Sequence, residues 1–351
     1  MTVRFPYILA IDTSCDDSAV AILKEDGHIA ADIVYSQNEI HAPYGGVVPE
    51  ISSRQHVSRI ARAVQEAFFQ AGLQPRDIKA VAVTFGPGLI GSLLVGVQFA
   101  KGFAQGLSLP IIGIHHIEGH LMAACGDATF PSPPFISLIV SGGHSAIYMC
   151  DKNYQFKTLG ETRDDAAGEA FDKIGRMLGF NYPAGKTIDD LSAIGDDNIY
   201  VFPVAMRSKA TLDYSFSGLK NSARLLIQTL LKEHGEIKGK VLFDFCAGLR
   251  KAIVAALLNK AFMACHAQEI KHLVLGGGVS ANSLLRTEAV RRGDLEKIQV
   301  HLPPVNHCVD NAVMIARAAL RRLKEGQQHT LDFNVIANVS VDTVSGQPPN
   351  R

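Results

Sequence analysis

The stretch YILAIDTSCDDSAVAIL, residues 7–23, decides the fold of this chain. An apolar run over residues 7–12 ends in a polar, acidic turn, and a second apolar run covers residues 19–23, which predicts a strand hairpin. The pattern returns as FISLIVSGGHSAIYMC, residues 135–150, with a turn rich in glycine. A hairpin that occurs once in each half of the chain indicates an internal duplication.

Strands and helices alternate along the rest of the chain. Residues 80–84 form a short apolar run, a glycine-rich turn follows, and residues 93–106 have a helical pattern with small residues on one side. Strands covered by helices predict an α/β fold. Three prolines within residues 131–134 exclude regular structure there and mark a lobe boundary. The sequence predicts an N-terminal lobe over residues 1–130, a C-terminal lobe over residues 131–340 and a flexible tail over residues 341–351.

Composition describes an ordinary globular protein. The 351 residues are 47% hydrophobic, and 34 basic residues balance 34 acidic ones, so any nucleic-acid contact has to be local. The six cysteines form no CxxC pair, which is typical of thiols in a reducing cytosol. No segment has the pattern of a signal peptide or a membrane span, so we expect a cytoplasmic protein.

The segment HHIEGH, residues 115–120, places His116 and His120 four positions apart. On a helix both imidazoles leave one face and can share a cation, although the spacing also fits two buried histidines that only make hydrogen bonds. Zinc peptidases have this spacing with a glutamate directly after the first histidine, whereas Glu118 comes two positions later and faces away. Asp310 has the chemistry of a third ligand, but its place before the last helix favours an N-cap.

Glycine-rich turns follow three apolar strands, at residues 85–92, 141–144 and 276–282. Glycine lets backbone amides approach a phosphate closely, and a helix N-terminus favours negative charge. Each turn alone is better explained as a tight connection, but together with the acidic turns they indicate a nucleotide held between two lobes. The acids of residues 164–172 fit helix caps better than ribose ligands.

These segments together resemble the bacterial tRNA threonylcarbamoyladenosine transferase family, TsaD. The resemblance is nearly full length and rests on IDTSCDDS (11–18), YGGVVPEISSRQH (44–56), FGPGLIGSL (85–93), HHIEGH (115–120), VSGGHS (140–145), DDAAGEAFDKIGRMLGFNYPAG (164–185), SFSGLK (215–220), GGGVSAN (276–282) and NHCVDNAVMIA from residue 306. It implies an actin-like fold of two related lobes with a ligand cleft between them. It also implies transfer of a threonylcarbamoyl group from threonylcarbamoyl-AMP to N6 of the adenosine next to the anticodon, in tRNAs that read codons beginning with A, with release of AMP.

The resemblance also implies the site residues. The metal ligands, for one divalent iron (Fe²⁺) or zinc ion, are His116, His120 and Asp310. The catalytic residues that it implies are Asp16 and Asp17. The substrate-binding residues are Ile139, Val140, Ser141, Gly142, Gly143, Asp172, Gly185 and Asn282, with Asp189 as a further contact.

Three departures from the family pattern stand out. Asp12 and Asp17 occupy positions where glutamate is common, which shortens each carboxylate's reach. Ala184 and Lys186 replace a glycine and a proline in the loop assigned to the ribose. Ile139 stands where archaeal and eukaryotic relatives have a metal-binding tyrosine, which marks the chain as bacterial.

Members of the family work with a TsaB-type paralogue and a TsaE-type ATPase, and a homodimer is expected in their absence. The last helix carries Arg317 and Arg321 on one face, which fits a solvated surface or a local tRNA contact. The rival functions are a small-molecule kinase of the same fold, which leaves the histidine pair unexplained, a metallopeptidase, which lacks its base, and a non-catalytic nucleotide-binding scaffold.

Overall fold

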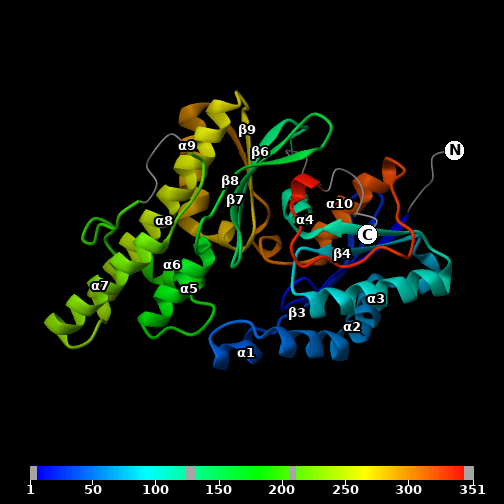
Figure 1. Ribbon diagram of the computed structural model, residues 1–351, viewed down its shortest axis with the longest axis horizontal. Helices are drawn as coiled ribbons and strands as arrows, with labels where there is room; N and C mark the ends of the chain where they lie inside the picture. Colours follow the sequence, from blue (N-terminus) through cyan, green and yellow to red (C-terminus); the bar gives the residue numbers. More distant parts are fainter. Residues whose placement is uncertain (1–5, 124–130, 205–210, 344–351) are drawn as a thin grey trace. The chain divides into compact units, whose positions relative to one another are not determined.

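The computed structural model describes residues 6–123, 131–204 and 211–343 of the chain (Figure 1). By its internal contacts the chain divides into two compact units. The first unit combines Met1–Phe130 with Val309–Arg351, and the second is Pro131–Cys308.

A five-stranded sheet forms the centre of the first unit within the described residues. Its strand order is β3 (Ile29–Tyr35), β2 (Ser18–Lys24), β1 (Tyr7–Asp12), β4 (Ala80–Gly86) and β5 (Ile111–His115). β1 and β2 pair antiparallel, with Ile8 opposite Leu23, and β1 pairs parallel with β4. The hairpin predicted from residues 7–23 is therefore confirmed.

Helices cover both faces of this sheet. Figure 1 shows α2 (Pro49–Ala71) and α3 (Ile90–Leu107) along one face and α10 (Ala312–Lys324) on the other. The strands consequently read as continuous apolar runs, because side chains of both orientations are buried. The remaining short elements of this unit are α1 (Asn38–His41), η1 (Ala42–Tyr44), η2 (Pro75–Asp77), α4 (His116–Met122) and η5 (Val341–Thr343).

The second unit repeats this topology. Its sheet has the order β8 (Phe156–Glu161), β7 (Ser145–Cys150), β6 (Phe135–Val140), β9 (His272–Gly276) and β10 (Gln299–His301). As in the first sheet, the hairpin strands are antiparallel and the two later strands are parallel to the first. Shared order and direction confirm the internal duplication.

A long buried helix, α8 (Gly239–Ala267), packs on β6, β7 and β9. Gly248 on α8 is needed because a Cβ there would lie 2.0 Å from the carbonyl oxygen of Tyr200. The other helices of this unit are α5 (Ala167–Met177), α6 (Gly185–Ser192), α7 (Ser217–His234) and α9 (Ser283–Glu296), with the 3₁₀ turns η3 (Gly278–Ala281) and η4 (Val305–His307).

The units differ from the predicted lobe ranges at the last helix. Residues 309–340 were expected with the second lobe, but α10 packs on β1, β2 and α4 of the first unit. Its apolar side chains, including Val313 and Ile315, are fully buried there. Of the tail predicted to be flexible, residues 341–343 form a 3₁₀ turn, and the rest lies outside the described residues.

No disulfide joins the five cysteines within the described ranges, and four of them are buried. The sixth, Cys125, lies outside those ranges. Across the same ranges, no helix combines the length and the apolar character needed to cross a bilayer.

Candidate functional site

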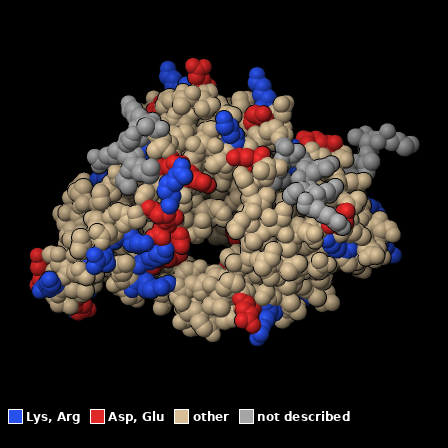
Figure 2. Space-filling model, in the orientation of Figure 1, with Lys and Arg blue, Asp and Glu red and all other residues tan. Residues whose placement is uncertain are grey.

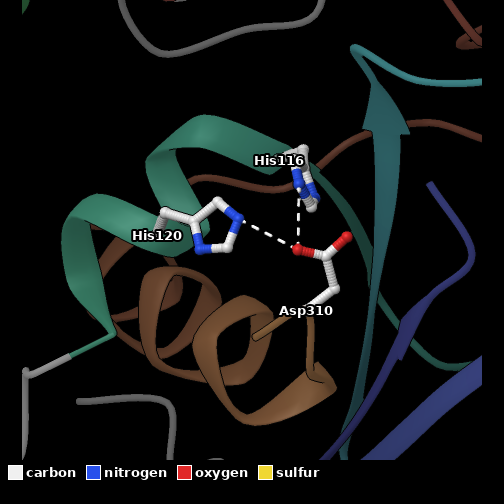
Figure 3. Close-up of side chains that lie close together, drawn as sticks. All are labelled: His116, His120 and Asp310. Atoms are coloured by element: carbon white, nitrogen blue, oxygen red, sulfur yellow. Dashed lines mark ion pairs between the residues drawn. The ribbon is translucent and has the colours of Figure 1, made fainter. Parts of the chain in front are cut away.

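His116 and His120 lie one turn apart on α4 with both rings buried. The helix begins directly after β5 because His115 caps it, its Nδ1 accepting the N–H of Ile117 at 3.2 Å. The ring centroids of His116 and His120 are 4.7 Å apart. Figure 3 shows both rings turned toward Asp310, so the predicted helical pairing of the histidines is confirmed.

Asp310 faces the histidines instead of capping α10. The cap is its neighbour Asn311, whose side-chain oxygen accepts the N–H of Met314 at 3.0 Å. Asp310 Oδ1 lies 3.1 Å from His120 Nε2 and 3.6 Å from His116 Nε2 (Figure 3). The N-cap role that local sequence favoured for Asp310 is wrong, because Asn311 adopts the extended capping conformation.

This cluster fits a divalent metal ion. The candidate ligand atoms of His116, His120 and Asp310 all lie within 4.8 Å of one another. Among the described residues, His120 Nδ1 has no hydrogen-bond partner although the residue is only 1% exposed, and Nε2 faces the Asp310 carboxylate. A buried imidazole without such a partner is costly unless it binds something else. Two imidazoles and one carboxylate suit zinc or divalent iron and leave further coordination positions open.

Asp12, at the end of β1, orients His116. Its Oδ2 lies 3.2 Å from His116 Nδ1, while its Oδ1 accepts the N–H of Ser14 at 3.0 Å. A carboxylate on one ring nitrogen directs the other nitrogen of a metal-binding histidine toward the metal. The sequence singled out Asp12 as part of an acidic turn and as a departure from glutamate, and missed this contact.

Two carboxylates set the charge of His116. Burial lowers the pKa of this imidazole, but the charges of Asp310 and Asp12, and the hydrogen bond from Asp12, outweigh burial and raise the pKa to about 9. The surroundings therefore favour positive charge at this point of the first unit, which is the electrostatic requirement of a cation site.

The acidic turn after β1 is held by α2. The carbonyl oxygen of Cys15 accepts hydrogen bonds from the Ser52 hydroxyl and from His56 Nε2, the latter at 2.9 Å. Because His56 Nε2 donates to a carbonyl, its Nδ1 accepts from the Ser18 hydroxyl at 2.6 Å. Burial lowers the pKa of His56 and keeps the ring neutral in this arrangement. These α2 residues belong to the block at residues 44–56, to which the sequence gave no role.

Asp16 and Asp17 lie in this turn, and Asp17 is close enough to Asp16 and to Asp310 for their charges to act on it. Burial, followed by the charges of Asp16 and Asp310, raises the pKa of Asp17 to about 7. The structure thus brings Asp17 into the electrostatic field of the predicted ligand Asp310, with Asp16 beside it.

The glycine-rich turn of the second unit joins β6 to β7. Ile139 and Val140 end β6, and the turn itself contains Ser141, Gly142 and Gly143. The start of α5 packs on this turn, with the Gly168 N–H donating to the Ser141 carbonyl at 3.2 Å. A Cβ on Gly168 would lie 2.5 Å from that oxygen, so only glycine permits the contact. These five predicted substrate-binding residues lie together.

Asp172, on α5, holds the loop before α6. Its Oδ1 accepts the N–H of Ala184 at 2.7 Å, and burial raises the pKa of its carboxyl. Gly185 is the first residue of α6, so Asp172 and Gly185 are brought together as predicted sites. The methyl group of Ala184 fits because residue 175 is a glycine and has no side chain.

Asp189 supports Asn282 and the start of α9. Its Oδ1 accepts from Arg250 Nη1 at 2.7 Å and from Asn282 Nδ2 at 3.0 Å, and its Oδ2 accepts the N–H of Ser283 at 2.9 Å. Asn282 in turn caps α9 by accepting the N–H of Leu285 at 3.1 Å. A direct contact of Asp189 with substrate stays a prediction, because its described bonds are internal to the unit.

The arginines of α10 do not form the solvated face that their spacing allowed, and the tRNA contact stays a prediction. Arg321 pairs with Glu118 and Glu325 and has a side chain only 15% exposed, while Arg317 donates to the carbonyl oxygen of Ala123. On the described surface drawn in Figure 2, basic and acidic side chains are interspersed without a broad patch of one sign.

Solved structures share the architecture at low sequence identity. Component A of the Acidaminococcus fermentans (R)-2-hydroxyglutaryl-CoA dehydratase aligns with a TM-score of 0.53 and 16% identity, over 90% of this chain and 98% of that chain. HypF from T. kodakarensis aligns with a TM-score of 0.58 and 14% identity, over 93% and 49%. The actin-like fold of two related units is thereby shown.

Relatives with much higher identity give the family. The tRNA N6-adenosine threonylcarbamoyltransferase of Anaeromyxobacter dehalogenans strain 2CP-C is 45% identical over 93% of this chain and 97% of that protein. The protein of the same name from Clostridium perfringens strain 13 is 42% identical over 95% and 97%. The TsaD family, described as tRNA N6-adenosine threonylcarbamoyltransferase, matches residues 28–317. The chain belongs to the TsaD family.

Proposed function

We propose that this chain forms t6A by the reaction its family is named for. It transfers the threonylcarbamoyl group of threonylcarbamoyl-AMP to N6 of the adenosine next to the anticodon, in tRNAs that read codons beginning with A, and releases AMP. The observation that carries this proposal is the His116, His120 and Asp310 cluster in a chain of this family. A kinase of the same fold is not favoured, because phosphoryl transfer uses Mg²⁺ on oxygen ligands and a pair of imidazoles does not suit that ion.

In the first unit, His116, His120 and Asp310 would hold one divalent ion, iron (Fe²⁺) or zinc. Such an ion supplies Lewis-acid polarisation of a carbonyl, here that of the threonylcarbamoyl group. Asp12 fixes the ring of His116, and Asp16 and Asp17 orient the attacking amine or accept its proton. His56 and Ser52 hold the turn that carries both acids.

In the second unit, the turn at Ser141, Gly142 and Gly143 would bind the AMP end through backbone amides. Gly142 and Gly143 are exposed, and a Cβ on either would meet no atom within 4 Å, so the turn offers its backbone to a ligand. Asp172 and Gly185 would contact the ribose, with Asn282 held in place by Asp189.

A reconstituted reaction tests the proposed function. The purified chain receives threonylcarbamoyl-AMP and unmodified tRNA, with and without a TsaB-type paralogue and a TsaE-type ATPase, and t6A is measured in digested tRNA. We expect t6A together with an equal amount of AMP. Failure of every combination to form t6A, with ATP turnover that depends on a small hydroxylated acceptor, would establish the kinase instead.

Replacing Gly168 with alanine is expected to weaken AMP binding about tenfold. The new Cβ would lie 2.5 Å from the Ser141 carbonyl and push the glycine-rich turn away from α5, and a backbone shift of this kind costs about 1–3 kcal/mol. Calorimetric titration with AMP measures the effect. Gly218→Ala on α7 is the matched control, because its Cβ would meet no atom within 4 Å. Equal AMP affinity in all three proteins would contradict the assignment of this turn.

The proposal includes association through α2 and α3 with a TsaB-type paralogue or, alone, with a second copy. Val57 on α2 and Ile90 and Leu94 on α3 are exposed apolar residues, 66%, 49% and 43%, on helices that lie side by side (Figure 1). Exposed apolar side chains gathered on neighbouring helices mark interaction sites.

The double variant Val57→Glu with Leu94→Glu is expected to weaken this association at least tenfold, because two charges would be buried without partners. Light scattering after gel filtration, alone and with the paralogue, measures it. Val290→Glu on α9 is the control, since Val290 is 43% exposed in the second unit. If the double variant associates as strongly as the control does, α2 and α3 do not form the association surface.

A further inference from the structure

Glu118 lies between the two metal-candidate histidines on α4 and is completely buried. Its Oε1 accepts from Arg322 Nε at 2.8 Å and its Oε2 from Arg322 Nη2 at 2.5 Å, while Arg321 Nη2 reaches Oε1 at 3.0 Å. The Arg322 side chain is only 3% exposed. Both oxygens are thus engaged by guanidinium groups, which excludes Glu118 from the general-base role of a peptidase.

This ion cluster joins the two elements that carry the candidate metal ligands. α4 provides both histidines, and α10 begins two residues after Asp310. The helices are closely packed, since a Cβ on Gly119 would lie 2.7 Å from the Ile315 side chain. A slip of one helix along the other would therefore change the distances between the histidines and Asp310.

We infer that Glu118 is a positioning residue that sets the register of α4 on α10 and thereby the geometry of the His116, His120 and Asp310 centre. The inference rests on the metal centre in the proposed function. A fork of two parallel hydrogen bonds fixes distance and angle, whereas apolar contacts permit sliding.

Stability alone does not account for this cluster. Replacing a buried ion pair by apolar residues of similar volume is often neutral or even stabilising, so a gain in stability is a weak explanation for this pair, and the role assigned to it here is to fix one arrangement. The arrangement chosen here is the one that brings three candidate ligand atoms within 4.8 Å. Outer groups that orient metal ligands typically change metal affinity 10- to 100-fold when they are replaced.

Titration of the metal-free full chain with Co²⁺ tests the inference, with the Co²⁺ d–d bands reporting affinity and coordination geometry. Glu118→Gln is expected to weaken Co²⁺ binding by about tenfold or more. That variant leaves Arg322 buried without its carboxylate, so we pair it with the double variant Glu118→Met with Arg322→Met, which buries no unpaired charge. The double variant is expected to regain thermal stability while Co²⁺ affinity stays low and the d–d bands stay altered.

Asp244→Asn is the control, since Asp244 is a buried carboxylate of the second unit paired with Lys240. It is expected to lower the melting temperature without changing Co²⁺ affinity. A folded double variant that binds Co²⁺ with wild-type affinity and spectrum would overturn the positioning role.

The Asp310→Ala variant separates this inference from the metal centre itself. If Asp310→Ala loses Co²⁺ binding while both Glu118 variants retain it, only the positioning role fails. If Asp310→Ala still binds Co²⁺ tightly, the assignment of the metal ligands is wrong, and the positioning role of Glu118 fails with it.

Discussion

His120→Ala is expected to abolish metal binding and to reduce t6A formation by about a thousandfold. His120 is buried, and its Nε2 lies 3.1 Å from Asp310 Oδ1, so alanine removes one of three candidate ligands and leaves a cavity in its place. A Lewis-acid ion supplies several kcal/mol of charge stabilisation in the transition state, and about 4 kcal/mol corresponds to a thousandfold in rate.

The metal content of the purified protein and the t6A content of digested tRNA measure this effect. His115→Asn is the matched control. His115 directly precedes His116 and is not among the three candidate ligands, and asparagine can replace it as the N-cap of α4. The control should keep its metal and most of its activity. Undiminished metal content in His120→Ala would refute the assignment.

Asp16→Asn is expected to lower kcat by about 10²- to 10⁴-fold while leaving the affinity for threonylcarbamoyl-AMP nearly unchanged. The attacking amine has to lose a proton, and Asp16 lies in the turn that α2 holds beside the candidate metal ligands. Asparagine has the size of aspartate but neither its charge nor its basicity, so the change removes the proposed chemistry without removing volume.

Single-turnover measurement of t6A, together with binding of threonylcarbamoyl-AMP, separates the chemical step from affinity. Asp26→Asn is the control, because Asp26 is an exposed acid that follows the β2 strand in the same unit. Turnover at the wild-type rate in Asp16→Asn would exclude Asp16 as orienting group or proton acceptor and leave Asp17 as the candidate.

The parts of the fold that local pattern determines could be predicted from the sequence. The two hairpins and the helical spacing of His116 and His120 depend on residues close together in the chain, and the structure confirms them. The position of α10 could not be predicted, because the apolar periodicity of a helix does not determine which sheet its apolar face will cover. Tertiary packing determines that α10 lies on β1 and β2.

The candidate site shows the same limit. Asp310 and Asn311 are both good capping residues, and the sequence could not tell which of the two would cap α10. The contact of Asp12 with His116 joins residues 104 positions apart, and no local pattern encodes it. Arg321 and Arg322 pair with Glu118 more than 200 positions earlier, so a face that reads as solvated is largely buried.

The adjacency of Asp310 and Asn311 links ion loading to local fluctuation of the chain. Opening of the first turn of α10 breaks the bond from the Met314 N–H to Asn311 and carries Asp310 away from the histidines in the same motion. If Asp310 binds the ion as we propose, ion binding would oppose that fraying. Under that proposal, hydrogen exchange at the Met314 amide would report what fraction of the protein has bound the ion, without any assay of catalysis.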